Sequence, residues 1–177
     1  MRQIVLLRGV NVGGNRPVAM TRLRETLTRL GYEDVATLLQ SGNVVLTSEQ
    51  KPAALETALA RQLSDEFGAR IEVVVRTRAE LARVIERNPL AGTAENPSRY
   101  LVHFLSAKLA VRRARELEAL AVSPERLIAR GRELYVWHPD GIRDSQLAAL
   151  LARGKLGVVS TARNWNTVTK LLVLADR

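Results

Sequence analysis

The sequence predicts an α+β protein with two ferredoxin-like (βαββαβ, alpha-beta plait) subdomains and a C-terminal helix. Three observations predict this fold. Short apolar or β-branched runs alternate with apolar residues at helical spacing. Each half of the chain contains two strand-like runs joined by a polar or glycine-containing turn. The order of elements is the same in both halves, although the halves share negligible residue identity.

In the first half, an apolar run before Arg8 predicts a buried strand, and leucines every three or four residues before Gly31 predict a helix that ends there. Pro52 suits the first turn of a second helix. The predicted order is a strand at 4–7, a helix at 20–30, strands at 35–39 and 44–47 around a turn, a helix at 52–67 and a strand at 71–75.

Thr77 and Glu80 have the spacing of a capping box, which predicts a helix at 78–87 that ends before Pro89. Residues 91–98 are polar and form the best linker candidate. We therefore expect a first plait at 1–77, a helix and linker at 78–98, and a second plait with the C-terminal helix at 99–177. The predicted second plait has strands at 100–105, 127–129, 134–137 and 158–160, with helices near 111–120 and 147–151 before the last helix.

Composition indicates an ordinary globular chain, with 46% hydrophobic and 25% charged residues. No cysteine is present, which excludes disulfides and thiolate ligands, and two histidines make a transition-metal site improbable, so we expect no cofactor. The apolar run near the N-terminus is too short for a signal peptide, and no segment reaches the ~18 apolar residues of a membrane span. These features predict a cytoplasmic protein without a membrane partner.

The loop after the first strand is the first candidate for ligand binding. Gly13 and Gly14 let the backbone approach a ligand closely, and Arg8 stands where its guanidinium can fork onto a phosphate or carboxylate. Asn11 and Asn15 add amide groups. The spacing matches neither a dinucleotide fingerprint nor a P-loop. A connection that needs glycines only to turn is an equally good interpretation of this loop.

The second candidate is the segment from Arg163 to Thr167. One of only two tryptophans, Trp165, stands between Asn164 and Asn166 at the start of the predicted last helix. Asn164 is suited to cap that helix. The alternative to ligand binding is a helix cap with Trp165 packed into the core.

Other polar residues carry weaker signals. The turn around Gln40 is expected at the opposite end of the sheet from the Arg8 loop, where Gln40 supports the turn. His103 is expected to be a core or sheet-face residue with its hydrogen bonds satisfied, and His138 has no carboxylate at ligand spacing. Arginine runs at 112–115 and 130–132 are typical of solvated faces, with phosphate binding as the less favoured alternative.

Three segments together resemble a known family. They are Leu6–Asn15 with Met20 and Leu23–Arg24, then Gln40–Val45, and finally Arg163–Val168 with Lys170–Leu171. In this order they resemble the bacterial "domain of unknown function 1697" family over nearly the whole chain. The resemblance implies two α/β-plait subdomains and gives weight to the two candidate segments. It implies no established substrate, reaction or cofactor.

Three functions are compatible with these patterns. The first and favoured one is binding of a small anionic or nucleotide-like ligand by the Arg8–Asn15 loop and the Arg163–Thr167 segment together. In that case any catalysis would act through positioning, since no activated nucleophile or general base is evident. The second is nonspecific nucleic-acid binding, which the net charge of +9 favours and the aromatic content of 4% disfavours. The third is a ligand-free interaction or structural module.

Overall fold

The computed structural model describes residues 1–13 and 17–177, and the chain divides into two compact units. Unit 1 consists of residues 1–83 and 170–177, and unit 2 consists of residues 84–169. The boundaries fall inside two helices, α3 (Arg78–Glu86) and α6 (Trp165–Ala175). Each of these helices therefore contributes residues to both units.

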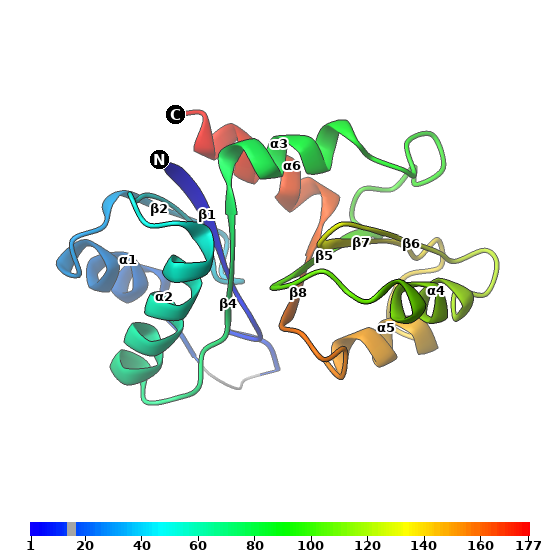
Figure 1. Ribbon diagram of the computed structural model, residues 1–177, viewed down its shortest axis with the longest axis horizontal. Helices are drawn as coiled ribbons and strands as arrows, with labels where there is room; N and C mark the ends of the chain where they lie inside the picture. Colours follow the sequence, from blue (N-terminus) through cyan, green and yellow to red (C-terminus); the bar gives the residue numbers. More distant parts are fainter. Residues whose placement is uncertain (14–16) are drawn as a thin grey trace. The chain divides into compact units, whose positions relative to one another are not determined.

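Unit 1 has the predicted order of strands and helices. Its elements are β1 (Arg2–Leu7), α1 (Met20–Arg29), β2 (Glu33–Leu38), β3 (Asn43–Thr47), α2 (Pro52–Phe67) and β4 (Val73–Thr77). The four strands form one antiparallel sheet in the order β2-β3-β1-β4. Figure 1 shows α1 and α2 covering the same face of this sheet. This is the ferredoxin-like plait that the element order predicts.

The core of unit 1 explains this arrangement. Val5 and Leu7 alternate along β1 and point to the helical face, where they pack with Leu23 of α1 and with Leu55 and Leu59 of α2. All five side chains are buried. The apolar period of two in the strand and of three to four in the helices thus brings one face of each element into a common core.

The turn between β2 and β3 does not lie where the sequence predicted. It lies at the same end of the sheet as the loop after β1, because Leu6 pairs with Asn43 and the backbone N–H of Leu7 donates to the carbonyl of Gly42 at 2.8 Å. The physical reason is the crossover through α1, which returns β2 parallel to β1. The carboxyl ends of both strands therefore meet at one edge, and the turn that follows β2 must lie there too.

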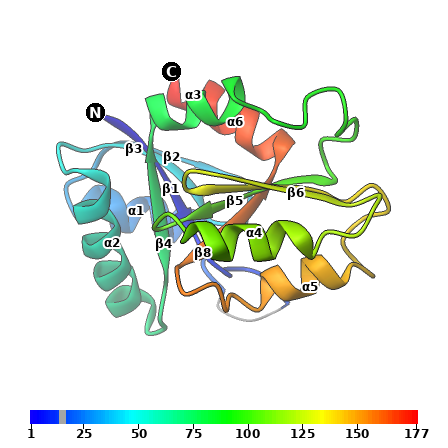
Figure 2. The same ribbon diagram turned by 45° about the vertical axis from the view of Figure 1, so that its right-hand side comes forward.

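Unit 2 repeats the topology. Its strands and helices are β5 (Tyr100–Leu105), α4 (Val111–Ala119), β6 (Arg126–Arg130), β7 (Glu133–Trp137), α5 (Gln146–Ala152) and β8 (Ser160–Asn164). The sheet order is β6-β7-β5-β8, again antiparallel, and Figure 2 shows α4 and α5 on one face. The last strand begins where the predicted run at 158–160 ends, because pairing with β5 recruits polar residues that carry no strand signal.

The helices α3 and α6 occupy equivalent positions, each beginning directly after the fourth strand of a sheet. The predicted capping box of α3 is confirmed: the N–H of Glu80 donates to Thr77 Oγ1 at 3.1 Å, and the N–H of Thr77 donates to Glu80 Oε2 at 2.8 Å. In α6 the cap is Asn164, whose Oδ1 accepts from the N–H of Thr167 at 2.9 Å. The C-terminal helix is thus the second copy of an element that the first half also contains.

Candidate functional site

Arg8 lies at the carboxyl end of β1 and shares a carboxylate with a second arginine. Its Nη1 lies 2.7 Å from Oε2 of Glu72, while Nη2 of Arg70 lies 3.0 Å from Oε1 of the same group. The Arg8 side chain is 27% exposed and that of Arg70 is 80% exposed. Two guanidinium groups around one carboxylate leave a net positive charge at this end of the sheet, and Arg8 is the less hydrated of the two.

The described residues of the loop after Arg8 include three with an unusual backbone conformation. Gly9, Asn11 and Gly13 have φ angles of 64°, 56° and 60°, in the left-handed region that residues with a Cβ rarely adopt. Asn11 also clamps the loop: its Nδ2 donates to the carbonyls of Val18 and Gln40 at 2.8 and 2.6 Å, and its Oδ1 accepts from the N–H of Val18 at 2.8 Å. Asn11 therefore joins the two ends of the loop to the β2–β3 turn.

The β2–β3 turn packs closely under this loop. A Cβ added to Gly42 would meet Cγ2 of Val10 at 2.6 Å and Cβ of Leu7 at 2.8 Å, distances that real side chains essentially never show. Asn43 fixes the turn from within by donating from Nδ2 to the carbonyl of Leu38 at 2.8 Å. Gly14 and Asn15, which the sequence also predicted as ligand-binding, lie outside the described residues.

In unit 2, Arg163 lies inside β8 rather than at the start of the last helix. Its side chain is buried, and Nη1 donates to Oγ1 of Thr161 at 2.8 Å and to the carbonyl of Ala162 at 2.7 Å. Burial lowers the pKa of the Arg163 guanidinium to about 10, which still leaves it charged at neutral pH. Arg76 is its counterpart, one residue before the cap Thr77 in β4, and it is also buried.

The three residues after Arg163 connect α6 to the segment before β5. Asn164 caps the helix, Trp165 stacks on Tyr100 with ring centroids 4.9 Å apart, and Asn166 Nδ2 donates to Oγ of Ser98 at 3.1 Å. Trp165 is neither sealed in the core nor fully exposed. Both interpretations of this segment, cap and ligand contact, were raised by the sequence, and the cap is confirmed.

A polar cluster around the buried His138 in unit 2 was not predicted. Nδ1 of His138 lies 2.6 Å from Oε1 of Glu125, which also accepts a hydrogen bond from Oγ of Ser145, the cap of α5. The sequence offered no carboxylate partner for His138, because Glu125 and His138 are thirteen positions apart and stand on either side of the β6–β7 hairpin. Oγ of Ser145 lies 3.4 Å from Nδ1 of His138, which is the same nitrogen that Glu125 engages. This order of groups differs from that of a serine hydrolase, in which the carboxylate and the serine contact opposite nitrogens of the imidazole.

His103, in the middle of β5, corrects another expectation. It is buried as predicted, but its Nε2 has no hydrogen-bond partner among the described residues. Burial lowers the pKa of His103 to about 4, with a further contribution from His138, so the imidazole is neutral at pH 7. Within residues 1–13 and 17–177, no three acidic or histidine side chains converge to hold a metal ion, and no helix is long and apolar enough to cross a membrane.

A family model described as a protein of unknown function (DUF1697) matches residues 1–135. The chain belongs to the DUF1697 family. The match includes the Arg8 loop and the β2–β3 turn but ends before the Arg163–Thr167 segment. The solved structure of the conserved bacterial protein SP0830 from Streptococcus pneumoniae is similar, with a TM-score of 0.75 and 24% identity over 98% of each chain. That likeness shows the fold of this DUF1697 protein, and no curated protein matches its sequence.

Proposed function

We propose that this DUF1697 protein binds a small anionic or nucleotide-like ligand, with Arg8 as the residue that holds its phosphate or carboxylate. One observation carries the proposal: Arg8 and Arg70 converge on the single carboxylate of Glu72. The loop that follows Arg8 has three residues with positive φ, so its backbone can come close to a bound group.

Partial burial makes Arg8 the stronger of the two cations for binding. Charges near a protein surface interact several times more strongly than in bulk water, because the effective dielectric constant is lower. A guanidinium also offers two parallel N–H donors to a phosphate or carboxylate. Glu72 engages Nη1 of Arg8 and keeps that side chain oriented. Arg70 compensates the negative charge of Glu72 that an anionic ligand would otherwise meet.

The contribution of the Arg163–Thr167 segment remains a prediction from the sequence. Its side chains already have structural partners, so a ligand contact there would be additional to the helix cap. Trp165, which is partly exposed, is the side chain of this segment whose aromatic ring is suited to stacking on a base. Comparing ligands with and without a base tests this part separately.

Isothermal titration calorimetry with inorganic phosphate, acetyl phosphate and ADP tests the proposal. We expect Arg8→Ala to weaken binding at least tenfold and Glu72→Gln to strengthen it, because the competing carboxylate is neutralised. If Arg8 and Glu72 had only structural roles, one substitution would not weaken ligand binding while the other strengthens it. Trp165→Ala should weaken ADP selectively if the second segment contributes.

Unit 1 contains a matched control. Arg22 and Arg29 share Glu66 at 3.1 and 2.6 Å, and the Glu66 side chain is exposed to 24%, close to the 20% of Glu72. This second cluster lies on α1 and α2, away from the β1 loop in the sequence. Arg29→Ala and Glu66→Gln should leave ligand binding unchanged. Equal responses of the two clusters, or no binding of any of the three compounds, would reject the proposal.

A further inference from the structure

Unit 2 contains a cavity of about 290 Å³ between α4 and the β6–β7 hairpin. Its floor consists of buried leucines, and its walls include small residues that leave the space open: Leu105, Leu109, Leu134, Ala114, Ala129 and Gly131. None of these residues belongs to the Arg8 loop or to the Arg163–Thr167 segment. The volume is close to the lower end of the range for small-molecule sites, about 300 to 1,000 Å³.

The helix α4 presents a distinct face to this cavity. Val111, Ala114, Arg115 and Glu118 line it, and their spacing of three, four and seven residues places them on one side of the helix. Leu117 points instead into the core of unit 2. Val111 at the rim is 61% exposed, so an apolar side chain faces solvent at the entrance.

The charges around the cavity differ from those on the rest of α4. Arg112 and Arg113 both pair with Glu116, at 2.9 and 3.2 Å. Lys108 and Arg115, which line the cavity, have no ion-pair or hydrogen-bond partner among the residues that the structure describes.

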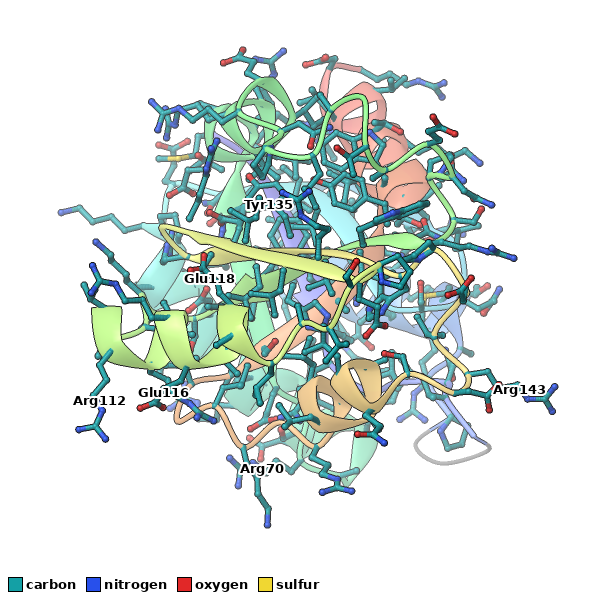
Figure 3. The ribbon with its side chains drawn as sticks, turned by 90° about the vertical axis from the view of Figure 1, so that its right-hand side faces the viewer. Arg70, Arg112, Glu116, Glu118, Tyr135 and Arg143 are labelled. Carbon is teal, nitrogen blue, oxygen red and sulfur yellow. The ribbon has the colours of Figure 1, made fainter. Side chains whose placement is uncertain are left out.

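Glu118 also lines the cavity but is already engaged. Its Oε1 accepts from the N–H of Ala129 at 2.8 Å, which fixes it to the wall formed by β6. Figure 3 shows Glu118 on the side of α4 that faces the strands, whereas Arg112 and Glu116 point away from them. Two cations against one engaged carboxylate leave the entrance net positive.

We infer that this cavity is a second binding site, for a small amphiphilic carboxylate with an unbranched apolar tail. The leucine floor removes the tail from water, and Lys108 and Arg115 meet the carboxylate at the rim. An uncharged molecule of the same shape would gain nothing from the two cations, and a small hydrophilic anion would leave the apolar floor unfilled. The site is independent of the ligand proposed for Arg8.

Titration of the 177-residue chain with sodium octanoate, followed by ¹⁵N–¹H NMR, tests this inference. We expect saturable shifts of the Ala114, Ala129 and Gly131 amides, with a dissociation constant on the order of 1 mM for so small a ligand. Octan-1-ol, which has the tail without the charge, and acetate, which has the charge without the tail, should each bind at least fivefold more weakly.

Two variants and one matched control locate the site. Lys108→Ala with Arg115→Ala should weaken octanoate binding roughly tenfold, as expected for the loss of two exposed charge pairs. Val111→Asp, at an exposed position, should weaken it as well by adding a negative charge at the rim. Arg112→Ala with Arg113→Ala removes the same net charge from the same helix and should change the affinity less than twofold.

The inference fails if octanoate shifts amides elsewhere or does not saturate. It also fails if octan-1-ol binds as tightly as octanoate, or if the Lys108 and Arg115 double variant retains full affinity. Binding only to vesicles of anionic lipid, without binding of free octanoate, would identify a membrane-surface contact and overturn the inference. None of these outcomes depends on the phosphate and ADP titrations of the Arg8 variants.

Discussion

Trp165 stacks on Tyr100, with their ring planes at 19° and their centroids 4.9 Å apart. The two residues begin α6 and β5, and the N–H of Trp165 also donates to the carbonyl of Pro97 at 3.1 Å. The ring stack and this hydrogen bond attach the start of the last helix to the segment that precedes β5. The main structural role of Trp165 is thus to hold two parts of unit 2 together.

Trp165→Ala should lower the free energy of unfolding by about 2–3 kcal/mol. The loss combines the stacking interaction, about 0.5–1.5 kcal/mol, with exposure of apolar surface. Urea denaturation followed by far-UV circular dichroism measures it without relying on tryptophan fluorescence. Trp165→Phe, which retains an aromatic ring, should lose less than half as much, and equal losses for both variants would argue against the stack.

Asn11 offers a test of the clamp between the Arg8 loop and the β2–β3 turn. Asn11→Gly keeps the backbone conformation but removes three hydrogen bonds, so we expect a loss of about 1–3 kcal/mol. Asn11→Ala removes the same bonds but keeps a Cβ at φ 56°, so we expect it to be about 1 kcal/mol less stable than the glycine variant. Thermal and urea denaturation of both variants provide the comparison. An alanine variant as stable as the glycine variant would contradict the strain at this position.

Gly42→Ala should be among the most destabilising single substitutions in unit 1. The new Cβ would meet Val10 and Leu7 at less than 3 Å, and the backbone has φ 74° at this position. Gly68 is the matched control, because it has φ 65° and no atom within 4 Å of the position that a Cβ would occupy. We expect Gly68→Ala to cost about 1–2 kcal/mol from strain alone, and Gly42→Ala to cost a further ~1–3 kcal/mol from overpacking. Equal urea midpoints for Gly42→Ala and Gly68→Ala would show that the turn shifts to accommodate the new Cβ without cost.

His103 should make the stability of the protein pH-dependent. Its pKa is lowered from 6.5 to about 4 by burial, so between these values the unfolded chain binds a proton that the folded chain does not. The free energy of unfolding should therefore fall as the pH decreases from 6.5 to 4, by up to about 3 kcal/mol, and recover as the pH rises. Urea denaturation at pH 7 and pH 4 measures this difference.

The matched variant for this prediction is His103→Leu. It removes a buried nitrogen that has no partner among the described residues, so we expect its stability at pH 7 to stay within about 1 kcal/mol of the parent protein. Between pH 6.5 and 4, the free energy of unfolding of this variant should change less with pH than that of the parent protein, because His103 no longer contributes. Carboxylates such as Asp176, whose pKa is lowered by a hydrogen bond from Arg78, titrate in both proteins and cancel in the comparison. Identical pH profiles would exclude the buried histidine as the cause.

Local features were predictable because they depend on residues close together in the chain. The capping box of Thr77 and Glu80 and the cap of Asn164 on Thr167 each join residues three positions apart, and the structure confirms both. The partners of Arg8 and Asn11 were not predictable in the same way. Glu72 and Gln40 are far from them in sequence, and only the order of strands in the sheet brings them together.

The sequence by itself determined the element order, the two plaits and most element positions, because apolar periodicity and turn residues act over a few neighbours. Tertiary structure decided the burial of Arg163 in β8, the stack of Trp165 on Tyr100 and the pairing of His138 with Glu125. Each of these depends on strand pairing or packing between residues distant in the chain. The free energy of such contacts comes from burial and geometry that no local pattern encodes.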